Sequence, residues 1–307
     1  MTNNNASSTS TDPVATTWQQ GLSTLLHPRV ATMLFLGFSA GVPILLIFSS
    51  LSLWLREAGV ERAAVTFFSW AALGYSFKFI WAPLIDQLPV PLLTKLLGRR
   101  RAWLLVSQLL VMVSIAIMAS VDPASASDAL TMMAVGAVML GFSSATQDIV
   151  IDAYRIESAP MNLQAMMSST YIAGYRIGMV IAGAGALYLA DYFGSTKATY
   201  NYAAWQTTYL IMAATMLVGV VTTFVISEPQ VAVTQDAERT ASTALSGTEN
   251  VRILGVFVVG VASFIALFGK GKHLLAPVVS VIIKSEKGKI YLNKPFVKLF
   301  IIVLAPV

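Results

Sequence analysis

Long apolar stretches separated by short polar loops organise most of this chain. A helix that crosses a bilayer needs about 20 mainly apolar residues, and six stretches before residue 230 meet that requirement. Turn and helix-stop signals such as Pro160 and Glu228-Pro229 lie in the connections. The pattern predicts an all-α membrane protein. The six expected spans are residues 30–53, 64–85, 102–121, 129–150, 163–190 and 204–226.

The two ends of the chain differ from this bundle. The leader is rich in Asn, Ser and Thr, and it lacks the basic and apolar regions of a cleaved signal peptide. The last segment holds most of the lysines, and its apolar runs are too short to span. The predicted units are a disordered cytoplasmic leader (1–28), the six-helix bundle (29–228), a cytoplasmic linker (229–250), a seventh span (251–269) and an anomalous Lys-rich tail (270–307).

Two explanations of the tail stay open. One is that residues 270–307 are read from a shifted or foreign frame after a truncation. The other is a genuine, divergent C-terminus with an interfacial amphipathic segment.

Composition narrows the class of protein. Hydrophobic residues make up 56% of the chain and charged residues 11%, a balance that soluble domains do not reach. The chain has no cysteine, and His27 and His273 are far apart in sequence, so we expect no metal site. Because no nucleophile motif, metal cluster or phosphate loop is present, we expect neither an enzyme nor a cofactor. No basic patch with stacking aromatic residues indicates nucleic acid.

The distribution of cations predicts how the bundle lies in the membrane. Lys95 and residues 99–101 lie between the second and third expected spans, Arg155 follows the fourth, and Arg239 follows the sixth. The alternate loops carry acids, balanced charges or a lone Lys197. Since cytoplasmic loops are enriched in Lys and Arg, the N-terminus is expected in the cytoplasm.

A polar string, residues 146–155, continues the fourth span without a turn signal. At about 100° per residue, Asp148, Asp152 and Arg155 fall within one wedge of the helix, and Gln147 begins the adjacent stripe. One interpretation is a solvated ion pair between Asp152 and Arg155 at the end of the helix, which contributes little. The other is an ionisable pathway, because charged groups inside a membrane are costly unless they serve function.

Two cations lie within the expected spans. Lys78 either snorkels to the cytoplasmic interface or faces a central cavity. Arg176 lies near the middle of its span, so it needs an interior partner or a substrate. A carboxylate beside such a cation can exchange a proton when the cation moves, and Asp148 is the best candidate, with Asp86 a weaker one.

Small and aromatic residues complete the pattern. Gly37, Gly41, Gly174 and Gly178 recur at intervals of four, a spacing that lets two helices approach closely. Six aromatic residues are candidates either for stacking on sugar rings or for packing and the membrane interface, and Trp54, beside Arg56, fits the interface best. They are Trp54, Trp70, Tyr75, Trp81, Tyr171 and Tyr175.

Several strings together resemble one family. They are FSAGVPILL (38–46), LREAGV (55–60), KFIWAPLID (78–86), GRRRAWLL (98–105), SATQDIVIDAYR (144–155) and GYRIGMVIAGAGALYLAD (174–191). Over residues 29–228 the chain closely resembles the AmpG muropeptide permeases of the major facilitator superfamily. The resemblance implies a bacterial inner-membrane carrier that uses the proton gradient to import N-acetylglucosaminyl-1,6-anhydro-N-acetylmuramyl peptides for peptidoglycan recycling. In some species the imported products also govern beta-lactamase induction.

The resemblance also implies roles for particular residues. Gly41 falls in the family's first-helix motif, and Gln147 and Asp148 fall in its fourth-helix motif. The expected substrate-binding residues are Gly41, Lys78, Gln147, Tyr175 and Arg176, and the expected proton-coupling residues are Asp148 and Asp152. The expected gating loop consists of Asp86, Arg99, Arg100 and Arg101, with a longer spacing from Asp86 to the arginines than the superfamily's compact loop has.

The predicted fold is therefore the N-terminal six-helix half of a major facilitator fold with one further span. Family members have two such halves, so the chain looks truncated, and transport by this chain alone is expected to need a second half or a second copy. The alternatives are an exporter of drugs or metabolites and a transport-inactive membrane protein.

Overall fold

Five helices form the bundle in a computed structural model that describes residues 25–68, 75–76, 78–125 and 127–229. Within those ranges, five helices are long and apolar enough to cross a membrane. They are Pro28–Glu57, Arg99–Ala119, Asp128–Ser158, Met161–Tyr192 and Tyr202–Val225. These helices confirm five of the six predicted spans. The helix Asp128–Ser158, which corresponds to the fourth predicted span, continues eight residues beyond the expected end at 150.

The second predicted span lies partly outside the described residues. Its described parts are helical at both ends, in α4 (Arg62–Phe68) and α6 (Ala82–Gln87), with a 3₁₀ turn, η3, at Lys78–Ile80. The seventh span, the tail and nearly all of the leader and linker lie outside the described residues.

Two of the spans contain a π-helical turn. The first consists of α2 (Pro28–Leu45), the π turn η1 (Leu46–Ser50) and α3 (Leu51–Glu57). Pro43 lies just before that π turn, where it cannot donate a backbone hydrogen bond and favours a local break. The fifth predicted span likewise consists of α10 (Met161–Val180), the π turn η4 (Ile181–Gly185) and α11 (Ala186–Tyr192).

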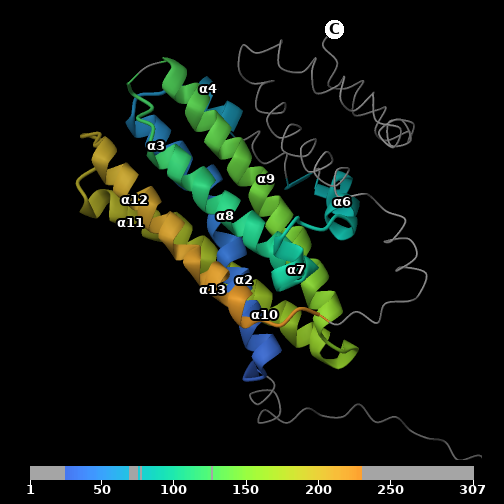
Figure 1. Ribbon diagram of the computed structural model, residues 1–307. Coiled ribbons are helices and arrows are strands. Elements are labelled where there is room, and N and C mark those ends of the chain that lie inside the picture. Colours follow the sequence, from blue (N-terminus) through green and yellow to red (C-terminus); the bar gives the residue numbers. More distant parts are fainter. Residues whose placement is uncertain (1–24, 69–74, 77, 126, 230–307) are drawn as a thin grey trace, which may run out of the picture.

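Successive spans along the chain run in opposite directions through the bundle (Figure 1). A five-residue helix, α7 (Leu93–Leu97), leads through Gly98 into α8 (Arg99–Ala119). The longest helix is α9 (Ser127–Ser158), which Ala159-Pro160 separates from α10. The bundle closes with α12 (Tyr202–Thr215) and α13 (Leu217–Val225). We call the end with Arg99 the basic end and the end with Trp54 the aromatic end.

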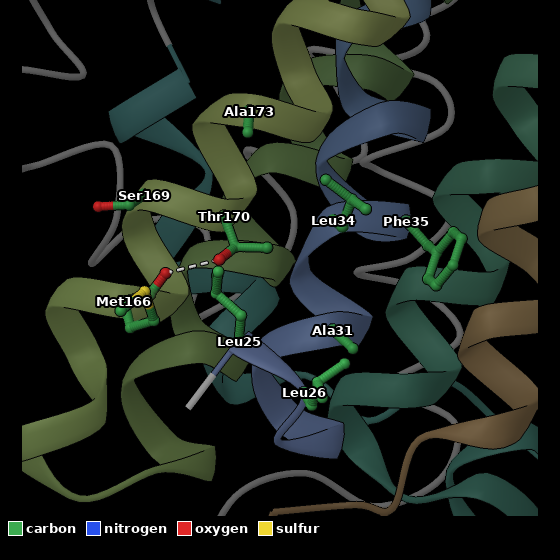
Figure 2. A pocket seen from close by; sticks show the side chains of 9 residues that line it. All are labelled: Leu25, Leu26, Ala31, Leu34, Phe35, Met166, Ser169, Thr170 and Ala173. Carbon is green, nitrogen blue, oxygen red and sulfur yellow. Dashed lines mark hydrogen bonds between the residues drawn. The ribbon is translucent and has the colours of Figure 1, made fainter. Parts of the chain in front are cut away.

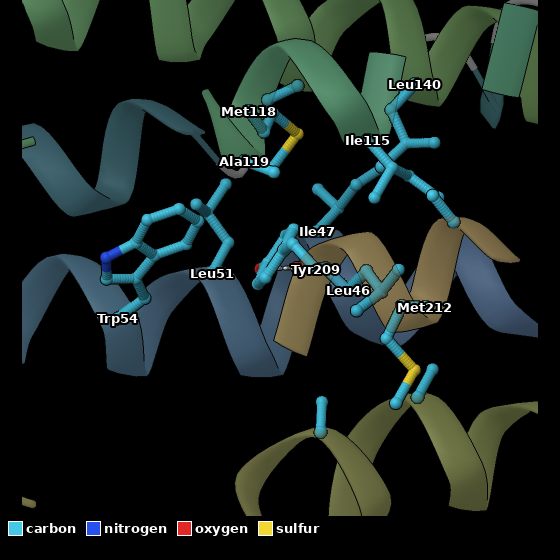
Figure 3. Close-up of a cluster of buried hydrophobic side chains, with 14 of the residues drawn as sticks. Leu46, Ile47, Leu51, Trp54, Ile115, Met118, Ala119, Leu140, Tyr209 and Met212 are labelled. Carbon is cyan, nitrogen blue, oxygen red and sulfur yellow. Dashed lines mark hydrogen bonds between the residues drawn. The ribbon is translucent and has the colours of Figure 1, made fainter. Parts of the chain in front are cut away.

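The core at the aromatic end combines buried aliphatic side chains with the rings of Trp54 and Tyr209 (Figure 3). Trp54 stacks on Trp205 with 5.7 Å between ring centroids and an interplanar angle of 3°. The Tyr209 hydroxyl donates to the carbonyl of Leu46, which also accepts a hydrogen bond from the Leu51 N–H in the π turn. The prediction that Trp54 lies at the membrane interface was wrong, because its side chain is fully buried against α12.

Hydrogen bonds tie the loops together at the aromatic end. Glu57 accepts hydrogen bonds from Ser195 (2.8 Å) and Trp205 (2.7 Å), which joins α3 to the loop before α12. Tyr200 donates to Asp122 at 2.6 Å and so joins that loop to the α8–α9 connection. Burial and then this hydrogen bond raise the pKa of Tyr200, so its phenol stays a donor at neutral pH.

A seam of four glycines brings α2 and α10 into backbone contact. A Cβ added at Gly37 would lie 2.2 Å from the Tyr171 carbonyl oxygen, and one at Gly174 would lie 2.0 Å from the Leu34 carbonyl oxygen. Gly41 and Gly178 are equally tight against the facing backbone. The predicted close packing of small residues is therefore confirmed, and only glycine fits at these four positions.

Candidate functional site

The polar string of the fourth span lies wholly within α9, because the helix continues to Ser158. The helical prediction for its faces holds. Gln147, Ile151 and Tyr154 are buried and face the core, whereas the Asp152 side chain is 51% exposed. Asp152 and Arg155 form the expected ion pair, with 3.5 Å between Oδ1 and Nη2.

Asp148 is the central charged group of the site. One carboxylate oxygen lies 3.9 Å from Nζ of Lys78, and the other accepts a hydrogen bond of 3.3 Å from the Tyr171 hydroxyl. The Asp148 side chain is 12% exposed and that of Lys78 is 37% exposed. The structure thus places the Lys78 side chain, which extends from the second predicted span to α9, beside Asp148 as expected.

Aromatic side chains surround this ion pair. The Tyr75 hydroxyl donates to Ser144 at 2.7 Å, and the Trp81 indole lies near Thr146 at 3.3 Å, so both rings pack against the face of α9 near Asp148. On the other side, Tyr171 and Tyr175 of α10 lie 6.0 Å apart between ring centroids. Tyr and Trp rings that carry hydrogen-bonding groups therefore lie beside the ion pair.

Gln147 does not face this cluster. Its side chain is fully buried, and Nε2 donates to the Ser39 hydroxyl of α2 at 2.9 Å. The expected direct contact with substrate stays a prediction. In this conformation the amide joins α9 to α2 instead.

Gly41 and Arg176 lie on either side of Tyr175. A Cβ at Gly41 would lie 2.1 Å from the Tyr175 carbonyl oxygen, so the glycine allows α10 to approach α2 at this level. Arg176 follows Tyr175 on α10 and its side chain is exposed. Within the described residues it has no ion-pair partner, although it lies midway along a membrane-length helix. The site therefore combines one paired cation and one unpaired cation.

A second cluster of charges lies at the basic end and includes the expected gating residues. Arg100 is 5% exposed and bonds to Asp86 (2.6 Å) and, through two nitrogens, to both carboxylate oxygens of Glu157. Arg99 donates to the Asp86 carbonyl at 2.6 Å. The long spacing between Asp86 and the arginines therefore does not prevent contact, because α7 folds back between them. Arg100 joins the second span, α8 and α9.

Glu228 is a member of this cluster that the sequence did not suggest. Its two carboxylate oxygens accept hydrogen bonds from the backbone N–H groups of Arg100 (2.8 Å) and Arg101 (3.1 Å), at the start of α8. Arg101 in turn donates to two carbonyls at the end of α13. A carboxylate at a helix N-terminus satisfies free N–H groups and the helix dipole. In the sequence, Glu228 indicated only the end of a helix before Pro229, and no motif marked Glu157.

An apolar cavity of about 440 Å³ lies elsewhere, between the basic ends of α2 and α10 (Figure 2). Among the described residues that line it, the polar side chains are two hydroxyls, and the Thr170 hydroxyl already donates to the Met166 carbonyl. Without a charged group it does not suit a charged cargo. The lining residues are Leu25, Leu26, Ala31, Leu34, Phe35, Met166, Ser169, Thr170 and Ala173.

The bundle and its charged clusters are those of a multi-pass helical membrane protein, and comparison with known proteins gives its family. Residues 31–288 match the Major Facilitator Superfamily, and the chain belongs to that superfamily. The match includes the linker, the expected seventh span and the first part of the Lys-rich tail.

Individual relatives are permeases and transporters by name. The chain is 40% identical over 200 residues to "Putative transporter AmpG 4" of Rickettsia felis, covering 65% of this chain and 45% of that protein. It is 36% identical over 210 residues to the "Anhydromuropeptide permease" of Escherichia coli K12, covering 68% of this chain and 40% of that protein. The chain thus spans less than half the length of these relatives.

Proposed function

We propose that the chain forms the N-terminal six-helix half of a proton-coupled importer of N-acetylglucosaminyl-1,6-anhydro-N-acetylmuramyl peptides in the bacterial inner membrane. The observation that carries the proposal is the Lys78–Asp148–Tyr171 cluster together with Arg176, which lies on the same helix as Tyr171 and has no ion-pair partner among the described residues. The relative named an anhydromuropeptide permease supports the choice of cargo. The imported product would serve peptidoglycan recycling.

The chemistry of such a cargo matches the side chains of the site. An anhydromuropeptide carries carboxylates on its peptide and apolar faces on its sugar rings. Arg176 would bind a carboxylate through its planar guanidinium, and the cargo would supply the counter-ion that the arginine otherwise lacks. Tyr175 and Tyr171 would contact the sugar faces.

Asp148 would carry the proton. A carboxylate removed from water is stable as an anion while Lys78 stays beside it and favours the protonated form when the ammonium group withdraws. A movement that separates Lys78 from Asp148, held at 3.9 Å here, would therefore load a proton. Asp152, one turn nearer the basic end and exposed, would pass protons toward the cytoplasm.

The basic-end cluster would close the cytoplasmic side. Arg99, Arg100 and Arg101 place the excess of cations there, so the N-terminus would be cytoplasmic as well. Alternating access requires a second six-helix unit opposite the site, supplied by a second half or a second copy of this chain.

Uptake by vesicles tests the proposal. The chain is expressed alone, and together with the C-terminal half of a related permease, in right-side-out vesicles from cells that lack their own muropeptide permease. We expect uptake of labelled anhydromuropeptide in at least one arrangement, abolished by a protonophore. Arg176→Gln is expected to raise KM about tenfold or more, because a charge-assisted hydrogen bond is lost.

The control is Lys197→Gln, which removes an exposed cation from a loop at the aromatic end and should leave KM unchanged. Absence of uptake in both arrangements would contradict the proposal. Proton-linked efflux of dyes in its place would favour the exporter.

A further inference from the structure

A layer of buried polar side chains crosses the bundle beside the candidate site. Ser39 of α2, Gln108 of α8, Gln147 of α9 and Thr223 of α13 are each 0% exposed. Buried polar groups normally have hydrogen-bond partners, since an unpaired one is costly in an apolar interior. Each donor and acceptor of the layer is therefore expected to have a partner.

Hydrogen bonds connect members of the layer and anchor them to the backbone. Gln147 Nε2 donates to Ser39 Oγ at 2.9 Å, and Ser39 Oγ donates to the Leu36 carbonyl at 2.9 Å. The single proton of the Thr223 hydroxyl has two acceptors within reach, Gln108 Oε1 at 2.9 Å and the Gly219 carbonyl at 3.0 Å. Two buried atoms of the layer then have no partner within the described part of the chain, the donor Gln108 Nε2 and the acceptor Gln147 Oε1.

Gly219 of α13 shows where the free donor lies. A Cβ added at Gly219 would lie 2.7 Å from Ser39 Oγ and 2.9 Å from Gln108 Nε2, so the two polar atoms face the same point. A hydroxyl has two acceptor lone pairs, and Gln147 uses one of those on Ser39. The other is available to Gln108 after a small shift. The Gln147 amide is thus bonded to the Ser39 hydroxyl, and the Gln108 amide nitrogen lies near the same hydroxyl.

We propose that Gln108 is a positioning residue that holds the Gln147 amide through Ser39, and with it the turn of α9 that carries Asp148. The connection runs from α13 through α8 and α2 to α9, so a shift of α8 or α13 reaches the residue next to Asp148. Its consequence for transport rests on the proposed function, but the connection itself does not.

Cysteine labelling tests this connection without any transport assay. Because the chain has no cysteine, Asp148→Cys introduces a single thiol, whose rate of reaction with a cationic methanethiosulfonate reports its exposure. The Asp148→Cys chain is then combined, one at a time, with Gln108→Leu, Ser39→Ala and Thr223→Val. We expect each to change the labelling rate about fivefold. Asp152→Cys, one turn further along α9, is the matched control and should stay within about twofold.

Combining two substitutions gives a second test, again by the labelling rate at position 148. Because Gln108 acts through Ser39, Gln108→Leu should add nothing to the labelling rate when Ser39→Ala is already present. Labelling rates at positions 148 and 152 that change in parallel would indicate general loosening and overturn the proposal. Unchanged rates, or additive effects of Gln108→Leu and Ser39→Ala, would also overturn it.

Transport separates this inference from the proposed function. If the unaltered chain takes up no anhydromuropeptide while Gln108→Leu still changes labelling at position 148 alone, the importer proposal fails and the positioning role stands. If uptake occurs and labelling is unaffected, the positioning role fails and the importer proposal stands.

Discussion

Replacing Gly174 by alanine is expected to destabilise the chain severely. The new Cβ would lie 2.0 Å from the Leu34 carbonyl oxygen and 3.0 Å from the Phe38 backbone nitrogen, and backbone atoms cannot rotate away as a side chain would. The helices α2 and α10 would have to separate along the whole seam. We expect a loss of about 3 kcal/mol or more, at the upper end of overpacking costs.

Thermal unfolding of the purified chain in detergent measures the effect, with an expected fall in Tm of about 10 °C. Gly185→Ala is the matched control, because its Cβ would meet only Ile181 Cγ2, at 3.8 Å. That variant should be neutral or slightly stabilised, since alanine loses less backbone freedom than glycine. Equal Tm values for the two variants would contradict the glycine seam.

Replacing Arg100 is expected to have the second large effect. The Arg100 side chain is 6% exposed and that of Glu157 is 18% exposed, so Arg100→Leu removes the close cation of a mostly buried carboxylate and leaves it only Arg99, at 3.8 Å. Removing one member of a buried pair typically costs about 3–5 kcal/mol. Arg100→Lys should recover only part of this loss, because an ammonium group cannot reproduce the forked contact with both Glu157 oxygens.

The double variant Arg100→Leu with Glu157→Leu separates charge from packing. Replacing both partners removes the uncompensated charge, so the double variant should unfold at a higher temperature than Arg100→Leu alone. Arg99→Gln is the control, because the Arg99 side chain is 38% exposed and lies 3.8 Å from Glu157, an arrangement worth about 1 kcal/mol or less. A double variant less stable than Arg100→Leu would show that the cost lies in packing.

Hydrophobic length and helical spacing predicted much of this structure. Five spans, the close approach at Gly41 and Gly174, and the wedge of Asp148 with Asp152 all follow from period and residue size. These features are local, because each depends on positions within one helix. The pairing of Lys78 with Asp148 was expected from the cost of isolated charge in a membrane rather than from any spacing.

Features that depend on which helix lies opposite could not be predicted in this way. A helical wheel placed Gln147 beside Asp148, but its direction is set by Ser39 of α2, and the amide turns inward. The sequence predicted that Trp54 lies at the membrane interface, but in the structure α12 covers its ring. Glu228 and Gln108 each have partners more than a hundred residues away, and no local pattern marks such a contact.

Proton-driven accumulation in vesicles, measured beside counterflow, tests the role of Asp148 most directly. Counterflow exchanges labelled for unlabelled anhydromuropeptide without net proton movement. If Asp148 carries the proton beside Lys78, Asp148→Asn should keep counterflow and lose accumulation driven by a pH gradient, whereas Lys197→Gln, at an exposed loop position, should keep both. Accumulation by Asp148→Asn at the rate of the unaltered chain would contradict the account.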